Sequence, residues 1–332
     1  EVVDSELVFA GFGVVAPEYD WNDYDGLDVE GKTVVVLVND PGFNSGNDQR
    51  FKGDAMTYYG RWTYKYEEAA RQGAAGILIV HDTEPASYPW AVVENGWTGP
   101  NLYLNADDNN MSRCAFEGWI SLSVAKGLFE QGGFEDYDFT SEAQKQDFTG
   151  FSLNQNLSLS FKNLIEHSSS KNVAGLLKGT ENPDEVIIYS GHWDHLGIGF
   201  PVDGDSIYNG AVDNASGIAA IIEIARKFSL NIPPKRSVLF LAVTAEEQGL
   251  LGSAYYAEHP IFEPKKSVAN INIDALTHLG KMKDLTVVGF GQSDLDDLAA
   301  EFAAAQDRYI LPDQHAGKGY FFRSDHFNFA KI

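Results

Sequence analysis

The sequence predicts an α/β protein, in which a mixed, largely parallel sheet is covered by helices on both faces and accompanied by a smaller, β-rich unit. From residue 186 onward, short apolar runs typical of buried strands alternate with helical runs. Earlier strand-like runs are separated by clusters of Gly, Asp and Asn, which favour turns. The 332 residues, 44% of them hydrophobic, suffice for two domains, because one core seldom grows beyond about 250–300 residues.

The smaller unit is predicted to cover residues 1–135, with strands at residues 7–10, 33–38 and 75–81. Residues 63–73 have apolar residues at helical spacing and end at Gly73, which is typical of a helix C-cap. Residues 120–133 return through a strand and a short helix, and residues 135–155 are polar and irregular. We therefore expect the domain boundary in this polar stretch.

The larger unit is predicted to cover residues 150–332. Apolar and polar residues alternate in residues 157–162, which is typical of a half-exposed edge strand. Further strands are expected at residues 173–177, 186–189, 238–243, 268–273 and 285–289. Helices are expected at residues 218–225, 249–259 and 294–306. This alternation of strands and helices favours a largely parallel sheet.

Ligand-type side chains lie where several of these elements begin or end. His192 follows the strand at residues 186–189, and Asp274 ends the strand at residues 268–273. Glu246 and Glu247 follow the strand at residues 238–243, and Asp213 opens a helical run. In open α/β sheets, chemistry gathers outside the carboxyl ends of parallel strands. The pattern therefore predicts one site that contains His192, Asp213, Glu246 and Glu247.

Composition excludes several other classes of function. The formal net charge is −24, so binding to the phosphate backbone of nucleic acid is not expected. The sequence contains no run of about 20 apolar residues that would span a membrane. Cys114 is the only cysteine, so any metal must be bound by His, Asp and Glu. Neither end looks like a natural terminus and no signal peptide is present, so we expect a mature, trimmed or fragmentary chain.

Four motifs then carry a family resemblance: GHWDH, VDNASG, TAEEQGLLGS and NIDAL, in this order. Together they resemble the co-catalytic zinc exopeptidases related to bacterial aminopeptidases and to glutamate carboxypeptidases. The resemblance implies the fold of those zinc exopeptidases, which is phosphorylase/hydrolase-like. Residues 1–125 resemble the protease-associated domain that is often inserted in such enzymes. The resemblance also implies a periplasmic or secreted location.

Position by position, the resemblance implies two zinc ions. His192 and Asp274 would bind the first ion, Glu247 would bind the second, and Asp213 would bridge both. Glu246 would be the general base. The physical argument agrees, because a bridging carboxylate holds two divalent ions about 3.5–4 Å apart and the pair lowers the pKa of a shared water. His and carboxylate ligands suit zinc, and suit manganese or cobalt less exclusively.

Other residues near the motifs have open or secondary roles. Asp194 either accepts the second ring N–H of His192, as a catalytic residue, or is a solvated turn residue. Asp325 and His326 are expected to line the site, and the second metal position is expected to lack one ligand in this polypeptide. The remaining histidines of interest are set aside as surface or outer residues: His195, His278 and His315.

The predicted function is that of a metallo-exopeptidase, most simply an aminopeptidase, which hydrolyses terminal peptide bonds with a water activated by two zinc ions. The expected partner is a peptide substrate. A carboxypeptidase or dipeptidase of the same fold is the alternative within enzymes, and a glutaminyl-cyclase-like acyltransferase shares the architecture. A receptor-like scaffold without catalysis is the alternative from a different class. Taken singly, each of these ligand residues is also explained as a helix-capping, turn or strand-end residue. Such an explanation does not account for all of them in one set of ordered motifs.

Overall fold

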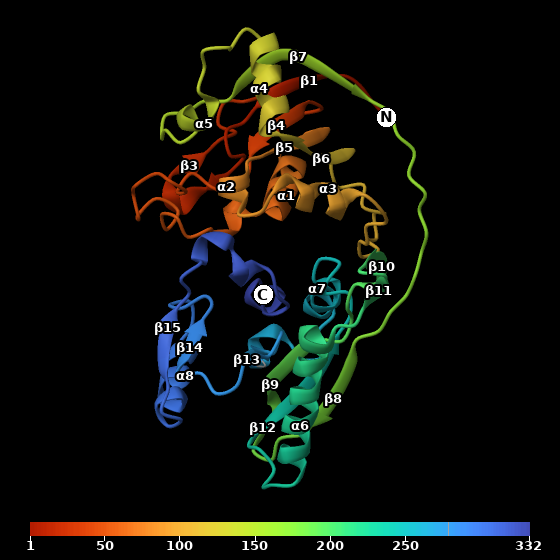
Figure 1. The fold of residues 1–332 in the computed structure, drawn as a ribbon, viewed down its shortest axis with the longest axis vertical. Helices are drawn as coiled ribbons and strands as arrows, with labels where there is room; N and C mark the ends of the chain where they lie inside the picture. The colour runs from red at the N-terminus through yellow and green to blue at the C-terminus, as the bar shows by residue number, and fades with distance from the viewer. Residues whose placement is uncertain (278) are drawn as a thin grey trace. The chain divides into compact units, whose positions relative to one another are not determined.

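The computed structural model describes residues 1–277 and 279–332. The chain divides into two compact units, whose elements are labelled in Figure 1. Unit 1 comprises residues 1–100, 105–165 and 313–322, and unit 2 comprises residues 101–104, 166–312 and 323–332. Within the described residues, no helix combines the length and the apolar character needed to cross a membrane.

Unit 1 is built on a five-stranded sheet with the order β6-β5-β4-β1-β7. Its strands are β1 (Val2–Phe9), β4 (Thr33–Leu37), β5 (Gly76–His81), β6 (Phe116–Ser121) and β7 (Phe151–Leu159). Neighbouring strands from β6 to β1 are parallel, whereas β7 is antiparallel to β1. The sequence TVVVL of β4 is wholly buried, as expected of a strand that is covered on both faces. The three strands predicted at residues 7–10, 33–38 and 75–81 are thus confirmed.

Helices cover both faces of this sheet. The helices of unit 1 are α1 (Trp62–Arg71), α2 (Thr83–Ala86), α3 (Trp90–Trp97), α4 (Leu122–Gln131) and α5 (Phe139–Glu142). On one face, Phe9 packs edge-to-face against Phe129 of α4 and Phe139 of α5. On the other face, Tyr66 and Ala69 of α1 belong to a second core. The helix predicted at residues 63–73 is therefore confirmed as α1.

The strand expected at residues 157–162 is a correction to the sequence prediction. It was expected at the edge of the larger unit, but residues 151–159 form β7 and pair with β1 in unit 1, with Ser5 opposite Leu157. The alternation of apolar and polar residues was interpreted correctly as a half-buried strand. Its partner depends on contacts distant in sequence, because Leu153 of this strand is fully buried in the same core as Phe9.

Short elements complete unit 1. They are β2 (Val15–Ala16), β3 (Trp21–Asn22) and four 3-10 helices, η1 (Pro17–Tyr19), η2 (Tyr58–Gly60), η5 (Ala316–Lys318) and η6 (Tyr320–Phe322).

Unit 2 is built on a four-stranded sheet with the order β13-β9-β12-β8. Its strands are β8 (Val173–Leu177), β9 (Asn182–His192), β12 (Arg236–Val243) and β13 (Ser267–Asn272). The strands β13, β9 and β12 are mutually parallel, whereas β8 is antiparallel to β12. The predicted mixed, largely parallel sheet is confirmed, and three adjacent strands end at the same edge.

Both faces of this sheet carry helices, as the sequence predicted. On one face, Phe228 of α6 (Gly217–Ser229) packs against Tyr189 and Phe240. On the other face, Tyr256 of α7 (Leu251–Glu258) and Phe329 of α9 (His326–Ala330) pack against a buried cluster from β9 and β12. Because residues of both β9 and β12 are buried in this cluster, the two strands are held side by side up to their carboxyl ends.

The rest of unit 2 consists of smaller pieces. A hairpin of β10 (Gly197–Val202) and β11 (Asp205–Tyr208) is followed by the π-helical turn η3 (Ala211–Ser216). The 3-10 helix η4 (Pro264–Lys266) precedes β13. The strand expected at residues 285–289 is β14 (Asp284–Val287), which pairs with β15 (Tyr309–Pro312) in a separate two-stranded sheet, and α8 (Leu295–Ala304) lies between them in sequence.

Candidate metal centre

The side chain of His192 lies at the centre of the site, at the carboxyl end of β9. It is almost fully buried, and its Nε2 lies 3.0 Å from Oδ1 of Asp213 and 3.2 Å from Oδ1 of Asp274. Asp274 follows β13, the parallel neighbour of β9, so the two side chains meet at one edge of the sheet. The ligand atoms of His192, Asp213 and Asp274, which the resemblance assigns to one ion, thus lie within 4.8 Å of one another.

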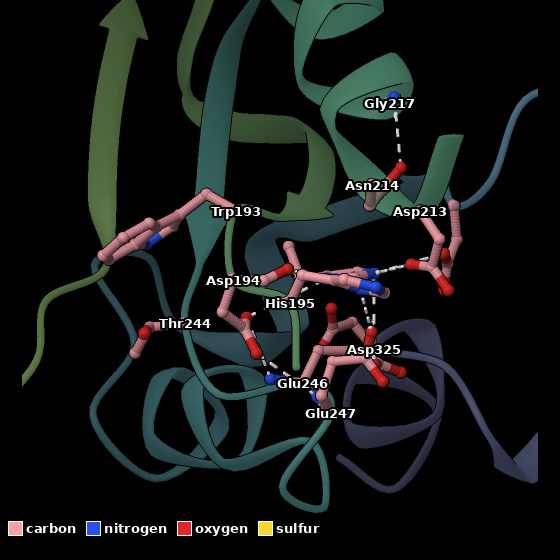
Figure 2. Close-up of polar contacts among 12 residues, drawn as sticks. Trp193, Asp194, His195, Asp213, Asn214, Gly217, Thr244, Glu246, Glu247 and Asp325 are labelled. Atoms are coloured by element: carbon pink, nitrogen blue, oxygen red, sulfur yellow. Dashed lines mark hydrogen bonds and ion pairs between the residues drawn. The ribbon is translucent and has the colours of Figure 1, made fainter. Parts of the chain in front are cut away.

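The other ring nitrogen of His192 contacts the main chain of Asp194 rather than its carboxylate. Its Nδ1 lies 3.0 Å from the main-chain oxygen of Asp194, whereas the nearer carboxylate oxygen of Asp194 is 3.8 Å away. The carboxylate instead accepts hydrogen bonds from the backbone N–H groups of Glu246, at 3.1 Å, and Glu247, at 3.3 Å. Asp194 thus holds the turn that carries both glutamates, as Figure 2 shows.

The turn after β12 is sharp. Ala245 has a φ of 53°, in the left-handed region that is uncommon for residues with a side chain. This conformation brings two successive N–H groups onto the carboxylate of Asp194. Strained positions of this kind concentrate at functional sites, and here the strain serves to point Glu246 and Glu247 into the site.

Asn214 ties the start of α6 to the loop after β13. Only 1% of the residue is exposed. Its side-chain nitrogen donates to the carbonyl oxygen of Ile273, and its side-chain oxygen accepts from the N–H groups of Gly217 and Ala275. Because Asp213 and Asp274 are the chain neighbours of these groups, Asn214 fixes the two carboxylates relative to each other.

We expect Asn214→Ala to destabilise the protein by about 3 kcal/mol, because three backbone groups lose their partner and each such loss costs about 1–3 kcal/mol when buried. Urea unfolding followed by circular dichroism would measure the change. Asn231→Ala, at an exposed position of the same unit, is the matched control and should change stability by less than about 0.5 kcal/mol. Equal stability of the two variants would contradict the role given to Asn214.

A second group of ligand atoms lies beside the first. It consists of His195, Asp213 and Glu247, and its ligand atoms all lie within 4.8 Å of one another, as do those of His192, Asp213 and Asp274. Nδ1 of His195 is 2.6 Å from Oε1 of Glu247. Asp213 belongs to both groups, which is the position expected of a bridging carboxylate. From the sequence, His195 is predicted to be a surface or outer histidine. The sequence feature that indicates a role for His195 is its place in the GHWDH motif, three residues after His192.

Glu246 lies beside His192 but belongs to neither group of ligand atoms. Its side chain is 11% exposed, and its Oε2 lies 3.9 Å from Nε2 of His192. Burial raises the pKa of Glu246 to about 8, with the negative charges of Asp325 and Asp274 acting in the same direction and His192 opposing them. The carboxyl group of Glu246 therefore holds its proton more strongly than an exposed glutamate does.

The other ionisable groups respond to the same crowding of negative charge. Burial lowers the pKa of His192, but the hydrogen bond to Asp274 and the charge of Glu246 outweigh it and raise the pKa to about 10. Burial and the charge of Asp213 raise the pKa of Glu247. Burial also opposes ionisation of Asp274, but hydrogen bonds from His192 and other donors hold its pKa below the usual value. Such like charges call for a cation.

The segment before α9 supports the site from the side of Asp274. The hydroxyl of Ser324 donates to Oδ2 of Asp274 at 2.6 Å, and the hydroxyl of Ser253 donates to the buried carboxylate of Asp325 at 2.5 Å. Burial raises the pKa of Asp325 to about 6. Neither ligand group contains Asp325 or His326. Among the other histidines set aside, His315 lies in unit 1 and His278 lies outside the described residues.

The donor chemistry of both groups fits zinc, which prefers imidazole nitrogen and carboxylate oxygen. Nδ1 of His195, Oδ1 of Asp213 and Oε1 of Glu247 are removed from solvent, and their near polar partners include Nε2 of His192, 3.0 Å from Asp213, and each other, His195 and Glu247 lying 2.6 Å apart. Buried polar atoms are normally hydrogen-bonded. Buried ligand atoms that converge in this way form a donor set that zinc could occupy.

Residues 172–332 match the model of Peptidase family M28. The curated relatives include the mouse (Mus musculus) "Aminopeptidase NAALADL1", which is 33% identical over 130 residues, covering 37% of this chain and 16% of the relative. A "Probable zinc metalloprotease" of Pyrenophora teres f. teres (strain 0-1) is 39% identical over 102 residues, 31% of this chain and 22% of the relative. These matches confirm the resemblance to zinc exopeptidases.

A third relative is the "Glutamate carboxypeptidase 2 homolog" of Caenorhabditis elegans, which is 31% identical over 133 residues, 38% of this chain and 16% of the relative. The chain therefore matches only 16% of the length of two of these relatives and 22% of the length of the third. Among solved structures, an aminopeptidase from Aneurinibacillus sp. strain AM-1 aligns with 99% of this chain and 63% of its own, with 22% identity and a TM-score of 0.45.

Proposed function

Because residues 172–332 match peptidase family M28, we propose that the protein is a zinc-dependent exopeptidase that uses two metal ions, and that it is an aminopeptidase. One observation carries the proposal: Asp213 is shared by two groups of ligand atoms, while Oε2 of Glu246 lies 3.9 Å from Nε2 of His192 and Glu246 belongs to neither group. Metal-assisted hydrolysis needs residues that bind the metal and, beside them, a base that does not bind it.

In this proposal, His192, Asp213 and Asp274 hold one ion, and Asp213 with Glu247 holds the other. When bound, zinc polarises the scissile carbonyl and lowers the pKa of water. The chain's own contribution is orientation. The main-chain oxygen of Asp194 fixes the ring of His192 by accepting from Nδ1, which leaves Nε2 facing the site.

Glu246 is the proposed general base. Its carboxylate takes a proton from the attacking water and passes it to the nitrogen of the leaving amine. A general base works best with a pKa near the working pH, and burial among carboxylates raises the pKa of Glu246 from its usual range toward that value. The hydrogen bond between its backbone N–H and Asp194 keeps it beside the ligands.

The proposed domains are a protease-associated domain within unit 1, which the sequence predicts at residues 1–135, and a catalytic domain within unit 2, which the sequence predicts at residues 150–332 although residues 150–165 lie in unit 1. The substrate is a peptide, and the proposed location is periplasmic or secreted. The assignment to aminopeptidases draws support from the relative named as an aminopeptidase, but a carboxypeptidase homologue matches over a similar length. The polarity of cleavage therefore needs a direct test.

We expect the protein to hydrolyse aminoacyl-p-nitroanilides and dipeptides blocked at the carboxyl end, and to leave dipeptides blocked at the amino end intact. An aminopeptidase must bind a free amino-terminal ammonium group, which an amino-terminal block removes. Release of p-nitroaniline and of free amino acid would be measured with and without a chelator. Cleavage of only the amino-blocked dipeptides would reassign the protein as a carboxypeptidase, and cleavage of neither class would favour a receptor-like scaffold.

A further inference from the structure

We propose that residues 313–322 of unit 1 act on the metal centre, because they hold the chain segment from which Ser324 orients the carboxylate of Asp274. The inference rests on the proposed metal centre and deepens it. Unit 1 includes residues 313–322, and unit 2 resumes at Arg323. Among the described residues, every member of the two ligand groups belongs to unit 2. A segment that supplies no ligand thus supports metal binding through its neighbour in the chain.

Residues 313–322 are attached to unit 1 by close main-chain contacts. The N–H of Met56 donates to the carbonyl oxygen of Ala316 at 3.3 Å. Gly319 is buried and has a φ of +63°, and a Cβ added to it would lie 2.6 Å from Sδ of Met56. Met56 is itself only 8% exposed, so it has little room to give way. A side chain at position 319 would therefore push the segment away from unit 1.

The residues that receive this segment are fixed in their own unit. The N–H and the hydroxyl of Thr57 both donate to Oδ2 of Asp40, at 2.9 Å and 2.6 Å. Asp40 is fully buried. The next residue, Tyr58, places its ring 6.0 Å from the ring of Phe322. Residues 56–58 thus give the end of the segment a firm attachment in unit 1.

Two residues after Phe322, the hydroxyl of Ser324 supports a metal ligand. It donates to Oδ2 of Asp274 at 2.6 Å and accepts from Nδ2 of Asn272 at 2.8 Å. The other carboxylate oxygen of Asp274 faces Nε2 of His192. Such a partner behind a ligand fixes the direction in which the ligand atom points.

The connection between the two attachments has little slack. Only Arg323 separates Phe322 from Ser324. Because an extended chain spans at most about 3.3–3.6 Å per residue, these two residues are joined by no more than about 7 Å of chain. Release of Phe322 from unit 1 therefore frees Ser324 to move and weakens the support of Asp274.

The first test follows the effect of zinc on the attachment, because coupling between two binding events is reciprocal. Hydrogen exchange would be measured by mass spectrometry for the peptide that contains Met56, in the wild type with zinc and with chelator. We expect zinc to slow the exchange of this peptide, although it lies in unit 1. Ser324→Ala should abolish the difference, whereas Ser169→Ala, at an exposed position of unit 2, should keep it.

The second test follows the effect of the attachment on zinc. Gly319→Ala should release the segment, which faster exchange at Met56 would verify, and should weaken zinc binding at one position. The expected loss in isothermal titration calorimetry is about tenfold, because loss of a partner behind a ligand costs about 10–100-fold in affinity. Gly46→Ala is the matched control, since Gly46 in unit 1 has a φ of +66° but an added Cβ meets nothing within 4 Å.

A spectroscopic measurement separates a positioning role from a structural one. The visible absorption spectrum of the cobalt(II)-loaded protein reports the geometry of the ligands, so it should change in Gly319→Ala and stay unchanged in Gly46→Ala. A merely structural role of Gly319 would lower the melting temperature without changing the spectrum. If Gly319→Ala does not fold or does not release the segment, Phe322→Ala removes the contact with Tyr58 and carries the same measurements.

The outcomes distinguish this inference from the proposed function. Exchange at Met56 that zinc does not slow would overturn the role of residues 313–322 and leave the two-metal function standing. Zinc affinity that stays unchanged after the segment is released would do the same. Failure of the wild type to bind zinc would overturn both.

Discussion

Replacement of Glu246 by Gln is expected to abolish most of the turnover while leaving metal binding intact. Glutamine keeps the size of the side chain and its place beside His192 but cannot accept the proton of the attacking water. Loss of a positioned acid or base typically lowers the rate by about 10²–10⁴-fold. The measurement is kcat for an aminoacyl-p-nitroanilide, together with zinc content by elemental analysis. The decrease should appear in kcat rather than in KM, because the base acts in the transition state.

Two glutamates serve as controls for this variant. Glu247→Gln removes a carboxylate of the second ligand group and should lose zinc as well as activity. Glu258→Gln makes the same chemical change at an exposed position of α7 and should be close to wild type in both. If Glu246→Gln lost zinc and Glu247→Gln kept it, the roles of the two glutamates would be exchanged.

The strands and most of the candidate ligands could be predicted because both depend on local sequence. A buried parallel strand is a short, continuous apolar run, so β9 and β12 are visible in the sequence together with the residue that follows each. His192 and Glu246 follow such runs directly. Once the strands are taken as parallel neighbours, their carboxyl ends must meet, and the convergence of ligands at one edge follows from topology.

What could not be predicted depends on contacts distant in sequence. For Asp194 the sequence leaves two roles open, an acceptor for the ring of His192 or a solvated turn residue, whereas its carboxylate accepts the N–H groups of Glu246 and Glu247, about 50 residues later. His195 lies in the second ligand group, where Gly210, 15 residues later, packs so closely that an added Cβ would lie 2.7 Å from Cβ of His195. The partner of β7 was likewise decided by a core formed with residues near the beginning of the chain. None of these pairings has a local pattern.

Removal of metal is expected to lower the melting temperature of the protein, and more strongly at about pH 8 than at about pH 5. In the metal-free protein, burial and neighbouring carboxylates raise the pKa of Glu246 from 4.5 to about 8. A carboxyl group with a raised pKa binds more protons in the folded state, so the metal-free protein loses stability as the pH rises from about 4.5 to about 8. Burial lowers the pKa of His192, but Asp274 and Glu246 outweigh it and raise this pKa from 6.5 to about 10. The metal-free protein therefore also loses stability through His192 as the pH rises from about 6.5 to about 10.

Zinc reverses this effect because it binds the deprotonated ligands. At a free concentration a thousand times Kd, each position adds about 4 kcal/mol of stability, and about 1 kcal/mol shifts the melting temperature of a unit of this size by about 2–4 °C. We therefore expect a chelator to lower the melting temperature by on the order of 10 °C or more at about pH 8. Differential scanning calorimetry with chelator, and then with excess zinc, would measure the shift and its recovery.

Asp213→Asn tests whether this stabilisation comes from the shared carboxylate. The variant should respond weakly to both chelator and zinc, because both ligand groups contain Asp213. Without metal it should melt at or above the temperature of the metal-free wild type, since one of the mutually repelling carboxylates is gone. Asp297→Asn makes the same charge change at an exposed position of α8 and should keep the full response. If neither chelator nor zinc changed the melting temperature of the wild type at either pH, the proposed metal centre would be refuted.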